Sequence, residues 1–110
     1  MNWISIDSEK IIEDIIGRSE GGPVLVFKHS TRCPISSMAL SRLERSNDKQ
    51  EIPCFFLDLI RYRDLSNKIA EQFVVEHQSP QVLLIKDGMC FYDDSHSGVT
   101  WENINSAINS

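Results

Sequence analysis

Residues 24–36 are Val-Leu-Val-Phe-Lys-His-Ser-Thr-Arg-Cys-Pro-Ile-Ser, and they predict a strand that passes directly into a helix. The first four residues are continuously apolar, which is typical of a strand buried on both faces. Pro34 suits the first position of a helix, where its missing N–H leaves no hydrogen bond unmade. Cys33 is therefore expected beside the unpaired amides and positive dipole end of that helix, which favour the thiolate, the reactive form of the side chain.

The residues on either side of Cys33 define the kind of chemistry that it could perform. Position 36, where a dithiol Cys-x-x-Cys site would carry its second sulfur, is serine. Ser36 cannot resolve an intermediate on Cys33, but its hydroxyl could donate a hydrogen bond to the thiolate; an ordinary serine in the first helical turn is the alternative. Arg32 adds a positive charge that favours the thiolate if the side chain turns towards the sulfur, and a solvated arginine is the alternative.

Apolar periodicity extends this unit into an alternating order of helices and strands. Asp64 is expected to cap the third helix, and Asp87-Gly88 is a strong signal for a two-residue hairpin turn. We expect a βαβ unit, a further helix, a hairpin and a last helix, which form an α/β domain with a mixed sheet of about four strands and helices on both faces. No linker-like segment divides the chain, so residues 1–110 are assigned to one domain. The predicted elements are a helix capped by residue 7 or 8 and ended by 17–22, a strand at 23–28, a helix at 34–47 with Ile35, Ala39 and Leu43 on one face, a strand at 53–59, a helix at 64–73, strands at 82–85 and 89–92, and a helix at 100–108.

Composition excludes several classes of function. The net charge is −5 and no basic block is present, which argues against binding to nucleic acid or to an anionic membrane. No apolar stretch approaches the length of a membrane span, and the first residues lack the features of a signal peptide. We therefore expect a cytoplasmic protein with reduced thiols, and the odd count of three cysteines also fits poorly with a disulfide framework.

The order of elements, with a cysteine after the first core strand, resembles the thioredoxin-like arrangement. Three stretches resemble the signatures of the monothiol bacilliredoxins, small thioredoxin-like proteins of the bacillithiol redox system: residues 28–36, residues 63–66 (Arg-Asp-Leu-Ser) and residues 77–81 (His-Gln-Ser-Pro-Gln). The resemblance extends from about residue 7 to residue 108. One departure is that Arg32 separates Thr31 from Cys33, where the family has an adjacent Thr-Cys pair, which leaves the role of Thr31 open.

The resemblance implies a thiol–disulfide oxidoreductase that removes bacillithiol, or a similar small thiol, from mixed disulfides on client proteins. Cys33 would be the catalytic residue, supported by Arg32, Pro34 and Ser36, and a second molecule of small thiol would clear it. No tightly bound cofactor or metal is implied. The family also implies a cis-proline that faces the redox cysteine, a role that falls on Pro80. The preceding Ser79 would offer backbone groups to substrate, and Gln81 would contact the small thiol.

Two other functions remain open from the sequence. A single Cys-x-x-Ser site can, in monothiol glutaredoxins, share an iron–sulfur cluster between two subunits with a small thiol as co-ligand. A non-catalytic interaction module that kept the fold is the third possibility. Absorbance of a cluster, or a slow reaction of Cys33 with disulfides, would favour these alternatives respectively.

The remaining cysteines and histidines are given structural roles. Cys54 lies in an apolar strand and Cys90 in the second hairpin strand, so both are expected to be structural thiols. A Cys–His catalytic pair of His29 with Cys33 is disfavoured, because His29 ends a strand and its direction is set by alternation. His77 precedes the proline loop, where a surface histidine is expected and a position at the border of the site is the alternative. Residues 93–96, Asp-Asp-Ser-His, are expected to form a loop with only a weak possibility of a metal site.

Overall fold

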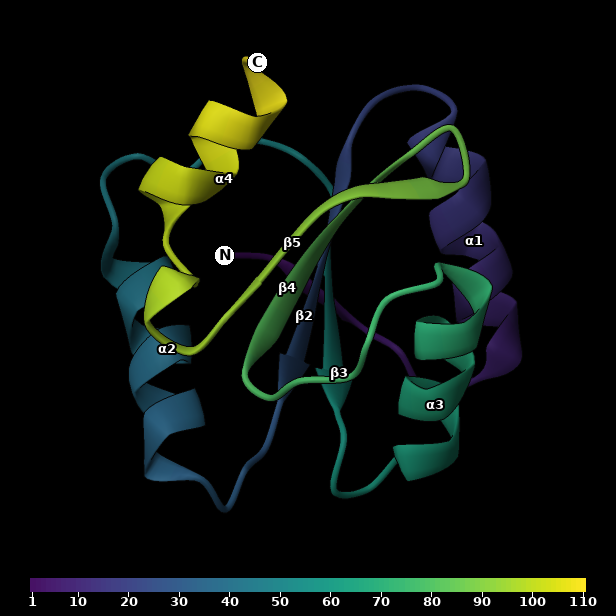
Figure 1. Cartoon of the computed structure of the whole chain (residues 1–110), viewed down its shortest axis with the longest axis horizontal. Helices are drawn as coiled ribbons and strands as arrows, with labels where there is room; N and C mark the ends of the chain where they lie inside the picture. The colour runs from purple at the N-terminus through teal and green to yellow at the C-terminus, as the bar shows by residue number, and fades with distance from the viewer.

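A five-stranded mixed sheet forms the centre of the protein (Figure 1), whose computed structural model describes residues 1–110. The strand order is β1-β3-β2-β4-β5; β1, β3 and β2 are parallel, while β4 is antiparallel to β2 and β5 is antiparallel to β4. The predicted mixed sheet is therefore confirmed, with one strand more than expected. The strands are β1 (Trp3–Ser5), β2 (Val24–His29), β3 (Cys54–Asp58), β4 (Gln81–Lys86) and β5 (Met89–Ser95).

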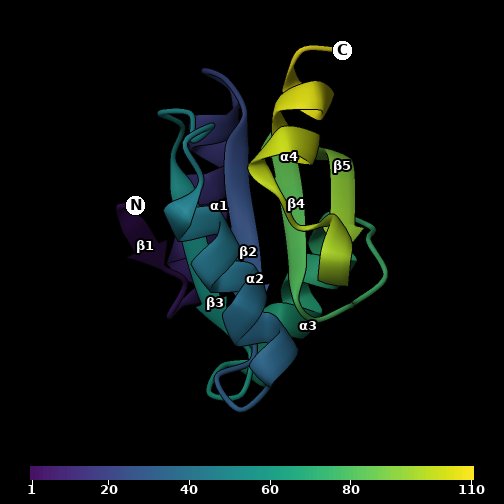
Figure 2. The same ribbon diagram turned by 90° about the vertical axis from the view of Figure 1, so that its left-hand side faces the viewer.

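Helices cover both faces of the sheet. Figures 1 and 2 show α2 and α4 on one side and α1 and α3 on the other, and the two hydrophobic cores divide in the same way. Ile15 and Ile69 belong to the core under α1 and α3, whereas Leu43 and Trp101 belong to the core under α2 and α4. The helices are α1 (Glu9–Ser19), α2 (Pro34–Arg45), α3 (Arg63–Gln72) and α4 (Trp101–Ile108), with a short 3-10 turn, η1 (His96–Gly98). None of them is long and apolar enough to cross a membrane.

Strand β2 lies in the middle of the sheet because its side chains are buried on both faces. Val24 and Val26 point into the core under α1 and α3, while Leu25 and Phe27 point into the core under α2 and α4. The alternation continues along the strand, so Lys28 and His29 leave β2 towards opposite faces.

The hairpin between β4 and β5 turns at Asp87-Gly88, as predicted. Both residues have positive φ angles, 52° and 75°, the left-handed conformation that a tight type I′ turn requires. Strand β5 then continues to Ser95, so the prediction of a loop over residues 93–96 was wrong except at His96, which begins η1. A bulge near Leu84 and Ile85 shifts the pairing of β4 with β5.

Three other local predictions were wrong. Strand β1 was not predicted, because its three residues are too few for a recognisable alternation. The buried face of α2 is formed by Ser36, Ala39 and Leu43, and Ile35 is 55% exposed, because the first turn of the helix lies at the edge of the sheet. Helix α3 begins at Arg63 with Tyr62 as its N-cap, so Asp64 lies inside the first turn and does not cap the helix.

Candidate functional site

Cys33 is the N-cap residue of α2, at the end of the sheet where β2 terminates. Its N–H donates to the carbonyl of Ser30 at 3.1 Å, and its own carbonyl accepts from Ser37 N at 3.0 Å, the first bond of the helix. Pro34 is the first helical residue, as predicted. The thiol is free and half-buried. The strand-to-helix turn therefore presents the sulfur beside the open amides of α2.

Ser36 is fully buried and its hydroxyl is engaged by partners other than Cys33. Its Oγ lies 2.7 Å from His29 Nδ1 and accepts a hydrogen bond from Ser30 N at 3.0 Å. Of the two alternatives for Ser36, the hydrogen bond to the Cys33 sulfur is not formed. The serine instead joins the first turn of α2 to the end of β2, and this fixes the turn that carries the sulfur.

His29 is a buried side chain that supports Ser36. Its ring stacks on Phe27 and packs at an angle against Phe56, with centroid distances of 5.7 and 5.4 Å. Burial lowers the pKa of His29, an effect that the nearby Asp58 carboxylate opposes. With Nδ1 on Ser36, the ring has no hydrogen bond to Cys33, which agrees with the expectation that the two do not form a catalytic pair.

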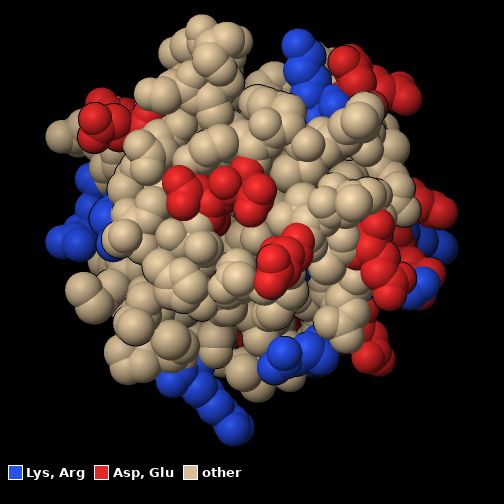
Figure 3. All heavy atoms as spheres, in the orientation of Figure 1, with Lys and Arg blue, Asp and Glu red and all other residues tan.

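Basic side chains gather at the end of the sheet that carries Cys33. Arg32 is exposed and makes no hydrogen bond or ion pair, so its guanidinium is solvated next to the site. Arg61 and Arg63 are exposed at the start of α3. In Figure 3 basic side chains lie at the lower edge, where α2 and α3 begin, and also at the left edge and the top, while acidic ones lie across the middle and right of this face. This end of an otherwise acidic protein can therefore attract anions.

In Figure 1 the segment that leads from α3 into β4 passes β3 and turns into β4 at the end of the sheet where β2 terminates. The Ser79-Pro80 peptide bond is cis, as the resemblance implied. Lys28 pairs with Gln81 across the two antiparallel strands, and the same register continued by one residue places Pro80 beside His29. Pro80 accepts a hydrogen bond through its carbonyl from His96 N at 3.1 Å, whereas Ser79 Oγ is buried without a partner.

The Gln81 side chain holds this segment from within the protein, whereas the resemblance gave it a contact with the small thiol. The side chain is fully buried. Its Oε1 accepts from Gln78 N at 3.2 Å, and its Nε2 donates to the Glu76 carbonyl at 3.0 Å and to Asp93 Oδ2 at 3.3 Å. The side chain of Gln81 therefore joins the segment before β4 to the neighbouring strand β5.

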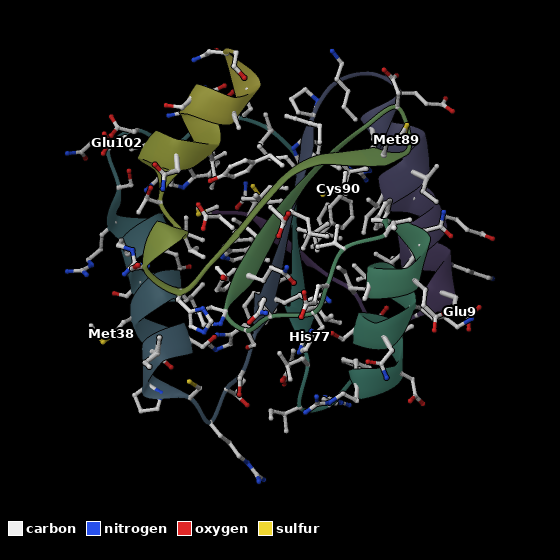
Figure 4. All side chains as sticks on the ribbon, in the orientation of Figure 1. Glu9, Met38, His77, Met89, Cys90 and Glu102 are labelled. Atoms are coloured by element: carbon white, nitrogen blue, oxygen red, sulfur yellow. The ribbon has the colours of Figure 1, made fainter.

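A second buried group under the same segment was missed by the sequence analysis. Lys28 is only 1% exposed, and its Nζ donates to the Ser66 carbonyl at 3.1 Å and lies 3.3 Å from His77 Nδ1. His77 is part-buried on the segment between α3 and β4 (Figure 4), where it contacts Lys28. The sequence signal that could have revealed this group is the presence of a lysine in an otherwise apolar buried strand.

The other two cysteines lie at the opposite end of the sheet from Cys33. Cys54 pairs with Leu25 at the start of β2, and Cys90 pairs with Ile85, which is opposite Val24. Four residues along β2 span about 13 Å, so neither thiol is near the end where Cys33 lies. Burial raises the pKa of the Cys54 thiol to about 11 and also raises the pKa of Cys90. Both side chains donate to backbone carbonyls, as expected of structural thiols.

No group of three or more histidine, cysteine, aspartate or glutamate side chains is arranged to hold a metal ion. In the 93–96 stretch the two carboxylates are used internally. Asp93 accepts from Gln81, and Asp94 accepts from the Tyr92 hydroxyl at 2.7 Å.

Comparison with known proteins agrees with this arrangement. A family model described as the monothiol bacilliredoxin BrxC matches residues 4–104. The chain belongs to the monothiol bacilliredoxin family. Among solved structures, this bacilliredoxin is similar to a protein provisionally described as an oxidoreductase with a thioredoxin fold, with a TM-score of 0.82 and 28% sequence identity over 94% of this chain and 91% of the other.

More distant thioredoxins share the fold alone. Thioredoxin from Trypanosoma brucei brucei has a TM-score of 0.74 at 12% identity, covering 99% of this chain and 93% of its own. A mutant thioredoxin from Halobacterium salinarum NRC-1 has a TM-score of 0.72 at 13% identity, covering 96% and 87%. Family membership, the thioredoxin fold and the oxidoreductase neighbour together support a thiol oxidoreductase.

Proposed function

We propose that this bacilliredoxin removes bacillithiol, or a similar small thiol, from mixed disulfides on client proteins, with Cys33 as the nucleophile. The observation that carries the proposal is the placement of the three cysteines. Cys33 is half-buried at the N-terminus of α2, whereas the other two thiols lie at the far end of the sheet and are kept protonated by burial. Only one sulfur is therefore available for exchange at this site.

The reaction takes two steps of thiol–disulfide exchange. In the first, the Cys33 thiolate attacks the bacillithiol sulfur of the client's mixed disulfide; the client thiolate leaves and takes a proton from solvent. In the second, the thiolate of another bacillithiol molecule attacks the bacillithiol sulfur now bound to Cys33. This releases the Cys33 thiolate and bacillithiol disulfide, so each step breaks one S–S bond and forms one.

A second thiol from solution is needed because position 36 carries a hydroxyl that is buried and occupied. Ser36 Oγ is bonded to His29 and to Ser30 N, and an alcohol cannot form the internal disulfide that a dithiol site would use. The client proteins and the small thiol are thus both partners of the reaction, and neither is tightly bound. A reducing compartment such as the cytoplasm is the setting in which this cycle can run.

The small thiol is proposed to bind through its acidic part to the basic end of the sheet. Bacillithiol carries malate carboxylates, and a guanidinium is a suitable partner for a carboxylate. Arg63 is exposed at the start of α3, close enough to His77 to lower the pKa of that ring. We expect Arg63→Ala to raise KM for a bacillithiolated substrate; an unchanged KM would exclude this contact.

The test of the function is intact mass spectrometry after exposure to the disulfides of bacillithiol, glutathione and coenzyme A, followed by peptide mapping. We expect one adduct, on Cys33, with bacillithiol preferred. Cys33→Ala should abolish the removal of bacillithiol from a client peptide, while Cys54→Ala and Cys90→Ala should retain it. Full activity in the Cys33→Ala variant would refute the proposal.

A further inference from the structure

Lys28 is an unusual residue for the centre of a sheet, because its ammonium is buried without a carboxylate. No aspartate or glutamate forms an ion pair with it. Its partners are the Ser66 carbonyl in α3 and Nδ1 of His77. Burial of a cation without a counter-charge is unfavourable, and it lowers the pKa of Lys28 to about 8. A hydrophobic side chain would fill this space more favourably, so the stability of the fold does not explain why an amine is present here.

The contact with His77 fixes the state of that ring. An ammonium can only donate, so Nδ1 must be the accepting nitrogen and the proton must reside on Nε2. Ser66 Oγ also lies 3.4 Å from Nδ1. Burial lowers the pKa of His77, and the positive charges of Lys28 and Arg63 lower it further. His77 is therefore held neutral, in one tautomer, against α3.

His77 lies in the segment that leads to the cis-proline. Two buried side chains hold the segment in place. Lys28 contacts His77, and Gln81 forms hydrogen bonds with Gln78 N and with the Glu76 carbonyl. The register of β2 with β4 brings the end of this segment alongside the residues that precede Cys33. A substitution at Lys28 can therefore change the position of this segment, although Lys28 itself does not contact Cys33.

We propose that Lys28 is a positioning residue, whose buried ammonium holds His77 and so fixes the segment 77–80 beside Cys33 for binding of the substrate. This inference rests on the proposed function for its effect on turnover, but the positioning itself does not. Loss of the ammonium frees the His77 ring and loosens the segment, while the turn that carries Cys33, held by Ser36 and His29, stays in place.

The experiment compares Lys28→Met, which keeps an unbranched side chain one atom shorter than lysine, with Lys86→Met as a matched control at an exposed position in β4. The ring of His77 is titrated by NMR, and amide exchange is measured for segment 77–80. In Lys28→Met we expect the titration midpoint of His77 to rise towards the ordinary histidine value of about 6.5 and the segment amides to exchange faster. Lys86→Met should match the wild type in both.

Turnover of a bacillithiolated peptide supplies the third measurement. We expect KM to rise roughly tenfold in Lys28→Met with kcat little changed, the effect of one lost hydrogen bond to a charged group on binding alone. His77→Leu should behave like Lys28→Met, and it keeps the inference testable if the lysine variant fails to fold. His77→Gln, which keeps an acceptor for the ammonium, should restore most of the affinity.

The outcomes separate this inference from the proposed function. An unchanged titration of His77, or unchanged amide exchange in the segment, overturns the positioning role of Lys28. A loosened segment with unchanged KM in an active enzyme overturns its relevance to the reaction. If the wild type does not turn over the bacillithiolated peptide at all, the proposed function fails, while the NMR measurements still decide whether Lys28 holds the segment.

Discussion

Replacing Lys28 by methionine should change the way in which the stability of the protein depends on pH. Burial lowers the pKa of Lys28 from 10.5 to about 8. Between these values the unfolded chain keeps a proton that the folded chain has lost, so the stability of the wild type rises with pH across this window. Below pH 8 the folded protein must bury the charged ammonium, which is unfavourable by about 3 kcal/mol relative to the exposed state.

The expected difference can be measured by urea unfolding at pH 7 and pH 9.5, followed by circular dichroism. Integrated over this interval, the linkage predicts that the free energy of unfolding of the wild type gains about 2 kcal/mol relative to that of Lys28→Met. The comparison with the variant matters, because the raised pKa of Cys54 makes stability fall as pH rises above 9 in both proteins. That contribution is common to the two and cancels.

The hydrogen bonds of the amine determine how stable the variant is relative to the wild type at pH 7. Lys28→Met loses the bonds to the Ser66 carbonyl and to His77, each worth about 1 kcal/mol, and it removes the cost of burying the charge. At pH 7 the variant should therefore be at least as stable as the wild type. A pH-independent difference between the two proteins would show that the amine is not a buried, titrating cation, and this would refute the reasoning.

Three further predictions follow from the site. Ser36→Cys should give a protein that forms an internal disulfide with Cys33, seen as a mass loss of about 2 Da on oxidation, and that turns over without excess small thiol; a persistent adduct on Cys33 would contradict this. Gln81→Leu should lower the free energy of unfolding by about 2 kcal/mol and raise KM, because it removes the hydrogen bonds to Gln78 N and to the Glu76 carbonyl, each worth about 1 kcal/mol, whereas the exposed Gln72→Leu should do neither. Burial lowers the pKa of His29, so the folded protein binds a proton there less readily than the unfolded chain, whose histidine titrates at about pH 6.5. The stability should therefore fall from pH 7.5 to pH 5.5, and His29→Gln should show a smaller fall.

The elements that could be predicted from the sequence are those determined by neighbouring residues. The apolar run of β2, the proline at the start of α2 and the Asp87-Gly88 turn all produce local signals, and each was placed correctly. Ile35 was wrongly placed in the core because helical spacing gives the period of a face but not where the helix passes the edge of the sheet.

The polar network under the site could not be predicted, because it depends on contacts between distant parts of the chain. Lys28, Ser66 and His77 come from β2, α3 and the segment before β4, and only the strand order brings them together. The same holds for Gln81, which the resemblance placed against the ligand. Its position at the start of β4 directs the side chain inwards to Gln78 and Asp93.

The separation of Cys33 from the other two thiols has a consequence for the cell in which the protein works. Under the proposed function, the chain has no internal route back to the reduced state, so the fraction of molecules carrying an adduct equilibrates with the surrounding small thiol. When that thiol is abundant and reduced, Cys33 is empty; when it is oxidised or scarce, the adduct persists. The fraction of Cys33 that carries an adduct would then report the ratio of the small thiol to its disulfide.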